Sequence, residues 1–147
     1  MRNKKLLSKL SNASAAIIID EKKRLLLQKR DNNKNIFFPN HWGCFGGAKE
    51  KNENYMKCIK REILEEIGLN LNSYIFLFSL SFNLKKKYNF KISRYYFFIK
   101  INNFMKKKIV LNEGSDFKFF SFEKLNNLKL APYDYHALTI YNYYYSK

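Results

Sequence analysis

The sequence predicts a single α/β domain in which helices pack on a mixed β-sheet. Short β-branched and aromatic segments stand on both sides of one strongly amphipathic helical segment, an order of elements typical of this class. The length of 147 residues suits one domain, and a composition that is 46% hydrophobic and 18% aromatic can form a core. We expect residues 14–147 to form the domain and residues 1–13 to form a basic N-terminal segment.

The first part of the domain is predicted to be extended. Residues 15–20 and 24–29 are two short aliphatic runs separated by charged residues, which favours a β-hairpin. Residues 31–35 are typical of a loop, and the aromatic stretch 36–45 is expected to run extended up to the glycine pair 46–47. Two adjacent glycines indicate a turn at which the backbone comes close to another group.

The strongest helix signal covers residues 55–67. Apolar side chains recur there at helical spacing on one stripe, formed by Met56, Ile59, Ile63 and Ile67. Asn54 can cap the first turn, and Gly68 can adopt the left-handed conformation that often ends a helix. The helix is therefore predicted to begin after Asn54 and to end before Gly68.

Strands are expected to dominate the chain after this helix. The predicted strands are two long aromatic segments at 74–83 and 90–101 and two shorter segments at 108–111 and 117–120. Residues 121–127 are expected to form a short helix. Asp134 is expected to cap a last helix that runs to about residue 145.

The net charge of +16 indicates a polyanionic partner such as a nucleotide, a nucleic acid or an acidic membrane surface. The basic runs at 22–24, 85–87 and 106–108 each stand beside a strand-like segment, which favours solvated turns over a continuous nucleic-acid track. No apolar run approaches the ~20 residues that span a bilayer. Cys44 and Cys58 are too few for a disulfide scaffold and lack zinc-site spacing, so a cytoplasmic protein is expected.

Acidic residues gather in and before the predicted helix of this basic chain. The cluster consists of Glu50, Glu53, Glu62, Glu65 and Glu66. The last three share one helix face, where like charges repel and a bound cation would remove the repulsion. Carboxylates without His or Cys suit a hard divalent ion, Mg²⁺ or Mn²⁺. The alternative is a solvated helix face on which Arg61 pairs with Glu65.

The string GAKEKNENYMKCIKREILEEIGL, from Gly47 to Leu69, resembles the signature of the Nudix hydrolase superfamily. That signature is G, five residues, E, seven residues and then R-E-U-x-E-E-x-G-U, where U is aliphatic, and every fixed position is filled. The resemblance implies a Nudix-like α/β/α sandwich with a mixed β-sheet. It also implies an enzyme that uses water and Mg²⁺ or Mn²⁺ to cleave the diphosphate linkage of a nucleoside diphosphate derivative.

The same resemblance implies a role for each residue of the motif. The implied metal ligands are the carbonyl of Gly46 and the side chains of Glu53, Glu62, Glu65 and Glu66. Glu62 and Glu66 match the principal ligands. Glu53 is expected to support the loop before the helix as well as to reach the metal. Arg61 matches the arginine that orients the carboxylates through ion pairs.

Glu62 and Glu113 are the main candidates for the general base that activates the attacking water, and Glu53 and Glu65 are the alternatives if Glu113 has no such role. Glu62 lies in the motif, but a carboxylate that coordinates Mg²⁺ is a poor proton acceptor. Glu113 lies in a turn between two predicted strands, next to Gly114, which would let the loop swing over the substrate. Glu113 is expected to act as the base or as a further metal ligand; the alternative is a solvated turn residue paired with lysine.

Substrate contacts are expected outside the motif. Arg30, at the end of the second predicted strand, would contact phosphate, although a surface arginine is an equal alternative. Trp42, Phe38 or Tyr133 would stack on a nucleobase, and the first two are equally well explained as core residues. Phe45 stands where the best-known branches of the superfamily carry proline, so no particular branch is assigned.

Two functions remain open from the sequence. The first is a pyrophosphohydrolase acting on a nucleoside triphosphate, a nucleotide sugar or a similar compound. The alternative is a non-catalytic Nudix-fold module that holds a nucleotide or RNA on its basic surface. Loss of catalysis normally erodes the carboxylates, and none is eroded here, which favours the enzyme. We expect a monomer or a homodimer without a membrane partner.

Overall fold

A computed structural model describes residues 12–83 and 91–147. In chain order the elements are β1 (Asn12–Ile19), β2 (Leu25–Lys29), β3 (Trp42–Gly43), β4 (Phe45–Ala48), α2 (Tyr55–Ile67), β5 (Ile75–Asn83), β6 (Lys91–Lys100), α4 (Asn103–Lys106), β7 (Asp116–Phe120), the 3₁₀ helix η1 (Phe122–Asn127) and α5 (Pro132–Tyr144). The basic run at 85–87 and all but the end of the N-terminal segment lie outside the described residues. No described helix is long and apolar enough to cross a membrane.

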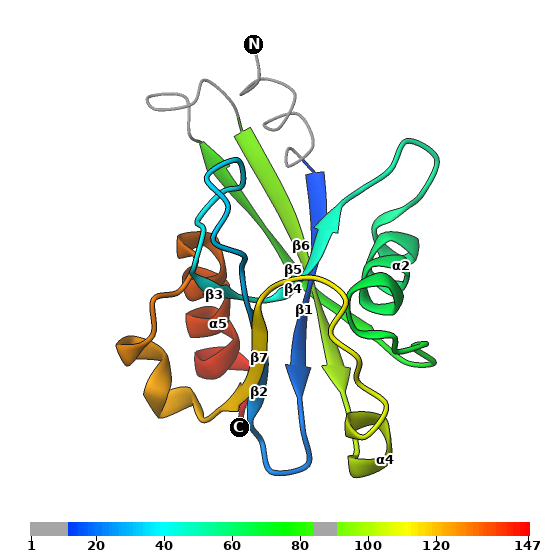
Figure 1. Cartoon of the computed structure of the whole chain (residues 1–147), viewed down its shortest axis with the longest axis vertical. Helices are drawn as coiled ribbons and strands as arrows, with labels where there is room; N and C mark the ends of the chain where they lie inside the picture. Colours follow the sequence, from blue (N-terminus) through cyan, green and yellow to red (C-terminus); the bar gives the residue numbers. More distant parts are fainter. Residues whose placement is uncertain (1–11, 84–90) are drawn as a thin grey trace.

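One mixed sheet forms the middle layer of the molecule (Figure 1). Its main path runs β3-β2-β1-β6-β5, while β4 pairs with β1 and β7 pairs with β2. β1 and β6 are parallel, and the other strand pairs are antiparallel. The predicted hairpin is confirmed, because β1 and β2 pair in register with Ile18 opposite Leu26.

The sheet carries a helix on each face, so the expected α/β/α sandwich is confirmed. Figure 1 shows α2 and α5 on opposite sides of the strands. Ile18 packs in the cluster beneath α2, whereas its neighbour Ile17 packs in the cluster beneath α5. The central strand β1 is therefore buried on both faces, which explains its apolar run from Ala15 to Ile19.

The bounds of α2 follow the local signals in the sequence. The Asn54 side chain accepts a hydrogen bond from the Lys57 amide, and Gly68 ends the helix in the left-handed region with φ of 71°. Met56 departs from the predicted apolar stripe, because its side chain is 49% exposed. Tyr55 instead makes the first-turn contact with the sheet, with its ring stacked on Tyr95 at 3.5 Å.

The strand predicted at residues 108–111 is wrong. The amide of Val110 donates to the carbonyl of Ile67 at 3.1 Å, and the amide of Asn112 donates to the carbonyl of Glu66 at 2.8 Å. These carbonyls belong to the last turn of α2, which has no partners for them within the helix. The segment therefore donates hydrogen bonds to the free carbonyls at the end of α2 instead of pairing in the sheet.

Two other predictions need correction near the aromatic segments. Residues 36–41 form turns rather than an extended chain, since Phe38 and Asn40 have positive φ angles of 50° and 61°, and β3 is two residues long. The last helix begins at Pro132, and Asp134 is not its cap. Proline is favoured in the first turn of a helix because no intrahelical partner awaits its missing N–H.

Candidate functional site

The glycine pair 46–47 lies within β4 and pairs with β1, so the turn predicted there is wrong. A cavity of about 410 Å³ lies between this glycine pair, the helix α2 and the loop before β7. It is lined by Gln28, Arg30, Asp31, Ile36, Gly46, Gly47, Glu62, Glu66, Asn112, Glu113 and Gly114. Five of the predicted site residues are therefore brought together: Arg30, Gly46, Glu62, Glu66 and Glu113. They come from four separate segments of the chain.

Glu66 is the most deeply placed carboxylate of the cavity. Its side chain lies on α2 and is buried, with 4% of the residue exposed. The amide of Gly46 donates a hydrogen bond of 2.8 Å to its Oε2. Burial, together with the neighbouring charge of Glu62, raises the pKa of Glu66 well above its usual range. A buried carboxylate with this surplus of negative charge around it is suited to a cation.

Glu62 lies one turn earlier on α2 and sits directly over Gly47. A Cβ atom at Gly47 would come within 2.6 Å of the Glu62 carboxylate, so the first glycine of the motif is needed for close approach. The Arg61 guanidinium donates to Glu62 Oε1 at 2.7 Å. Burial nevertheless raises the pKa of Glu62, because the loss of water outweighs the arginine contact.

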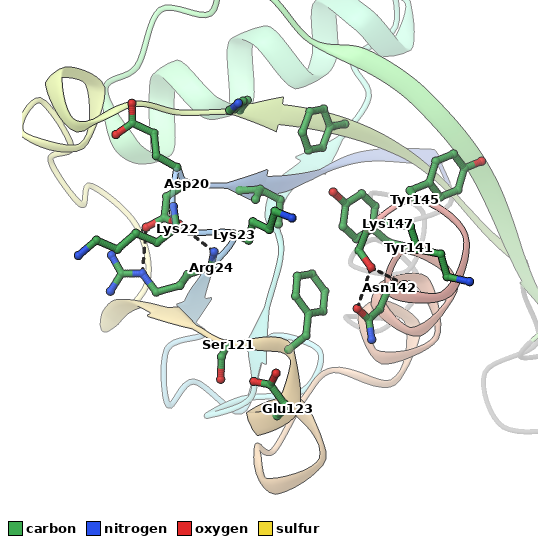
Figure 2. Close-up of a pocket in the computed structure, with 16 residues that line it drawn as sticks. Asp20, Lys22, Lys23, Arg24, Ser121, Glu123, Tyr141, Asn142, Tyr145 and Lys147 are labelled. Carbon is green, nitrogen blue, oxygen red and sulfur yellow. Dashed lines mark hydrogen bonds and ion pairs between the residues drawn. The ribbon is translucent and has the colours of Figure 1, made fainter.

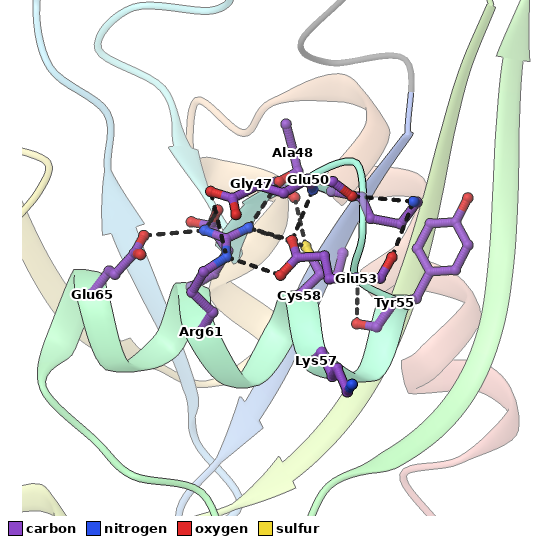
Figure 3. A network of polar contacts seen from close by, with 12 residues as sticks. Gly47, Ala48, Glu50, Glu53, Tyr55, Lys57, Cys58, Arg61 and Glu65 are labelled. Atoms are coloured by element: carbon purple, nitrogen blue, oxygen red, sulfur yellow. Dashed lines mark hydrogen bonds and ion pairs between the residues drawn. The ribbon is translucent and has the colours of Figure 1, made fainter.

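Arg61 is the centre of a network of carboxylates, as the sequence predicted (Figure 3). Its guanidinium donates to both oxygens of Glu53, at 2.6 and 3.0 Å, and to Glu65 at 3.1 Å. It also donates to the carbonyl of Ala48 at 3.1 Å. The hydrogen bonds from Arg61 lower the pKa of Glu53 to about 2. Arg61 thus ties the loop before α2 to the helix face that carries Glu62.

Glu53 and Glu65 lie in this arginine network and do not line the cavity. The Glu65 side chain is 51% exposed and faces Arg61 from the outer side. A direct metal contact by either residue stays a prediction. Their observed contacts support a role in orienting Arg61, and through it Glu62.

Glu113 lines the same cavity as Glu62 and Glu66. Its charge contributes to the raised pKa values of both Glu62 and Glu66. The loop that carries it is fixed at both sides: Asn112 bonds to the carbonyl of Glu66, and Gly114 packs against the backbone of β2, where a Cβ would come within 2.9 Å of the Lys29 carbonyl. Gly114 therefore serves close packing in this structure.

Gln28 lies on β2 and Arg30 directly follows this strand, and both residues line the cavity. The Arg30 Nε atom donates to the carbonyl of Phe37 at 2.7 Å, which holds the guanidinium beside the cavity. Gln28 is buried and donates to the Cys44 carbonyl at 3.3 Å. Gln28 was not among the predicted site residues, although its position as a single amide in the aliphatic run LLLQK indicated a specific polar contact.

The three predicted aromatic contacts lie outside the cavity lining. Trp42 packs on Phe120 at 4.9 Å and borders the core cluster beneath α5, in agreement with its alternative interpretation as a core residue. Phe38 and Tyr133 meet edge to face at 5.5 Å. Contact of any of these rings with a nucleobase stays a prediction.

A buried ion pair beside Tyr133 was not foreseen. Arg94 on β6 donates to Asp134 at 3.3 Å, and Asp134 also accepts hydrogen bonds from the amide of Cys44 and the hydroxyl of Tyr96. The Arg94 guanidinium lies over the Tyr133 ring at 4.3 Å. Residues 40 positions apart form this pair, so no local pattern could reveal it.

A second cavity, of about 510 Å³, lies at the turn between β1 and β2 and the C-terminal end of α5 (Figure 2). None of the predicted site residues lines it. Its buried carboxylate, Asp20, already pairs with Arg24 at 2.8 Å and with Lys106 at 3.0 Å. The first cavity is therefore the candidate active site.

The donors of the first cavity fit a hard divalent cation, since carboxylates, an amide and backbone carbonyls offer oxygen alone. Within residues 12–83 and 91–147, no three acidic, His or Cys side chains already surround one common point. The reason is visible in the contacts: Glu62 is turned to Arg61 and Glu66 to the amide of Gly46. These contacts engage Oε1 of Glu62 and Oε2 of Glu66.

Comparison with known proteins agrees with the fold and the motif. A profile described as the NUDIX domain matches residues 9–139. The chain is similar to a MutT protein from Methanosarcina mazei Go1, with a TM-score of 0.75 and 21% identity over 92% of this chain and 95% of that chain. It is also similar to the E. coli dihydroneopterin triphosphate pyrophosphohydrolase, with a TM-score of 0.71 and 17% identity over 90% and 95% of the two chains.

A third similar structure is a C. elegans Ap4A hydrolase in a binary complex, with a TM-score of 0.71 and 18% identity over 91% and 96% of the two chains. A comparison with curated protein sequences found no match. The match of the family profile covers most of the chain and includes the complete motif from Gly47 to Leu69. The chain therefore belongs to the Nudix hydrolase superfamily.

Proposed function

We propose that this protein is a metal-dependent pyrophosphohydrolase that cleaves the diphosphate linkage of a nucleoside diphosphate derivative with water. The observation that carries the proposal is the meeting of Glu62, Glu66 and Glu113 in one cavity with the guanidinium of Arg30. Hydrolysis of a polyanionic substrate needs cationic groups that bind its phosphates. It also needs carboxylates that hold a metal ion and accept a proton from water. The family membership and the Nudix neighbours support the same reaction class.

The proposal gives a task to several residues in and beside the cavity. Glu62 and Glu66 would hold Mg²⁺ or Mn²⁺, which when bound supplies charge neutralisation for the phosphates and acidifies the attacking water. The amide of Gly46 and the guanidinium of Arg61 keep these two carboxylates in place. Arg30 would contact a phosphate oxygen beside them.

Among the glutamates that line the cavity, Glu113 is the general base in this proposal. Within the described residues it forms no ion pair with a lysine or arginine, whereas Glu62 is paired with Arg61. A carboxylate that coordinates a metal is a poor proton acceptor, because the cation depresses its basicity. Glu113 would accept the proton of the attacking water.

The experiment that tests the proposal is product analysis by chromatography. The protein is incubated with Mg²⁺ and a panel of nucleoside triphosphates, nucleotide sugars, ADP-ribose, dinucleoside polyphosphates and triphosphorylated RNA. We expect at least one compound to be cut at its phosphoric anhydride, and the reaction to stop when a chelator removes the metal. Tight binding of a nucleotide or RNA without any product would contradict the proposal and favour the non-catalytic binding module.

A further inference from the structure

The outer edge of β5 has no strand partner among residues 12–83 and 91–147, where β5 pairs with β6 alone. This strand has nine residues, IFLFSLSFN, and carries no charge in a chain with 28 basic residues. Edge strands of monomeric proteins are commonly protected by lysine, proline or a short length. β5 has none of these three protections.

The sequence of β5 is self-complementary. Residues 78–82 read Phe-Ser-Leu-Ser-Phe, which is identical in both directions. Two antiparallel copies centred on Leu80 would place Phe78 opposite Phe82 and Ser79 opposite Ser81. Aromatic pairs and serine pairs of this kind stabilise neighbouring strands. The pairing has two-fold symmetry, so each copy presents the same surface.

The geometry of β5 suits such a pairing. The register shift against β6 lies between Phe76 and Phe78, so the strand is regular from Phe78 to Asn83. Ser79 and Ser81 are exposed on one face, while Phe78, Leu80 and Phe82 are half-buried on the other. The half-buried face continues the apolar cluster beneath α5, to which Phe78 and Leu80 belong. A second copy would extend this cluster across the symmetry axis.

We propose that β5 pairs with β5 of a second copy of this chain, antiparallel and centred on Leu80, to form a homodimer with one continuous sheet. Each copy carries a net charge of +16, so long-range repulsion opposes the association. Added salt screens that repulsion and leaves the neutral contact unaffected. The dimer is therefore stronger at high ionic strength than at low ionic strength.

Charge placement on the exposed serines tests both the dimer and its register. In the proposed register position 79 faces position 81 of the second copy. The variant S79K/S81K places like charges opposite each other twice, whereas its matched control S79K/S81E places opposite charges there. Both variants lose the Ser81 to Ser93 hydroxyl contact of 3.0 Å, so that loss cancels. Sedimentation equilibrium at high micromolar protein gives the dissociation constant of each.

We expect a wild-type dimer, a dissociation constant at least about tenfold higher for S79K/S81K than for S79K/S81E, and a heterodimer when S79K/S81K is mixed with S79E/S81E. Equal thermal midpoints of the two lysine variants show that both are folded. A wild-type protein that stays monomeric at high salt would overturn the proposal. Equal dissociation constants for the two variants would overturn it as well, since the contact would then lie elsewhere.

Discussion

Glu113 is the residue whose role the structure sharpens most. The sequence placed it between two strands, but the preceding strand is absent and the loop is bound to the end of α2. The result is a carboxylate in the same cavity as Glu62 and Glu66, whose pKa values are raised by burial and further by the charge of Glu113. A glycine-hinged loop that swings over the substrate is not needed to bring Glu113 to the site.

We expect Glu113→Gln to lower kcat by about 10²-fold or more, because a glutamine cannot accept the proton of the attacking water. Steady-state kinetics on the substrate found in the panel would measure this. Glu123→Gln, at an exposed position of η1, is the matched control and should keep the wild-type rate. A kcat of Glu113→Gln within threefold of wild type would return this residue to the solvated turn that was its alternative interpretation.

At the scale of elements, the parts of the fold with local signals were predictable. The helix α2 has its cap at Asn54 and its stop at Gly68, and both act through contacts within a few residues. The segment 108–111 was mispredicted because its partners are carbonyls of α2, more than 40 residues earlier in the chain. Short apolar segments have no pattern that distinguishes a strand from a segment that hydrogen-bonds to the end of a helix.

The glycine pair in β4 provides a test at this scale. A Cβ at Gly47 would lie within 2.6 Å of the Glu62 carboxyl atoms, so Gly47→Ala should displace that carboxylate and lower kcat by about tenfold or more. Gly68→Ala is the matched control, because its Cβ would meet nothing within 4 Å. It should cost about 1 kcal/mol of stability through the positive φ and keep kcat. Equal kcat values for the two variants would contradict the role assigned to Gly47.

The turn between β1 and β2 makes a prediction about pH. Burial raises the pKa of Asp20, but hydrogen bonds from Arg24 and Lys106 outweigh it and lower the value from 3.8 to about 2. A lowered carboxyl pKa contributes stability above the unfolded value, and this contribution of about 2 kcal/mol is lost as pH falls from about 4 towards 2. Urea unfolding gives the free energy of unfolding of wild type and of Asp20→Asn. The gap between these two free energies should therefore be largest at pH 7 and should shrink below pH 4. A gap that is constant with pH would refute the assignment.

At the scale of the whole molecule, the sequence predicted the α/β/α sandwich and contained the motif of the candidate site. It did not predict the long-range contacts that join the strands to each other and to α5. The parallel pairing of β1 with β6 joins strands about 80 residues apart, and the buried pair of Arg94 with Asp134 joins the sheet to α5. Contacts of this kind depend on the complete topology. Composition and periodicity carry no information about them.

The net charge of +16 also belongs to this scale. Basic surface residues steer a polyanionic substrate from a distance, whereas the cavity acts at contact distance. We expect KM to rise as salt is raised while kcat stays unchanged, since screening acts on the approach of the substrate. Initial rates over a range of ionic strength give both constants. A KM that does not respond to salt would show that the charge takes no part in binding.

The most direct measurement of the central claim is a Mn²⁺ titration, followed by electron paramagnetic resonance, of wild type, Glu66→Gln and the control Glu123→Gln. Glu66→Gln removes a buried anion without removing volume, so its thermal midpoint should not fall, while its Mn²⁺ dissociation constant should rise at least about tenfold and hydrolysis should cease. Glu123→Gln should match wild type in all three properties. If wild type and Glu66→Gln bind Mn²⁺ equally and hydrolyse within tenfold of each other, the cavity around Glu62 and Glu66 is not the metal centre.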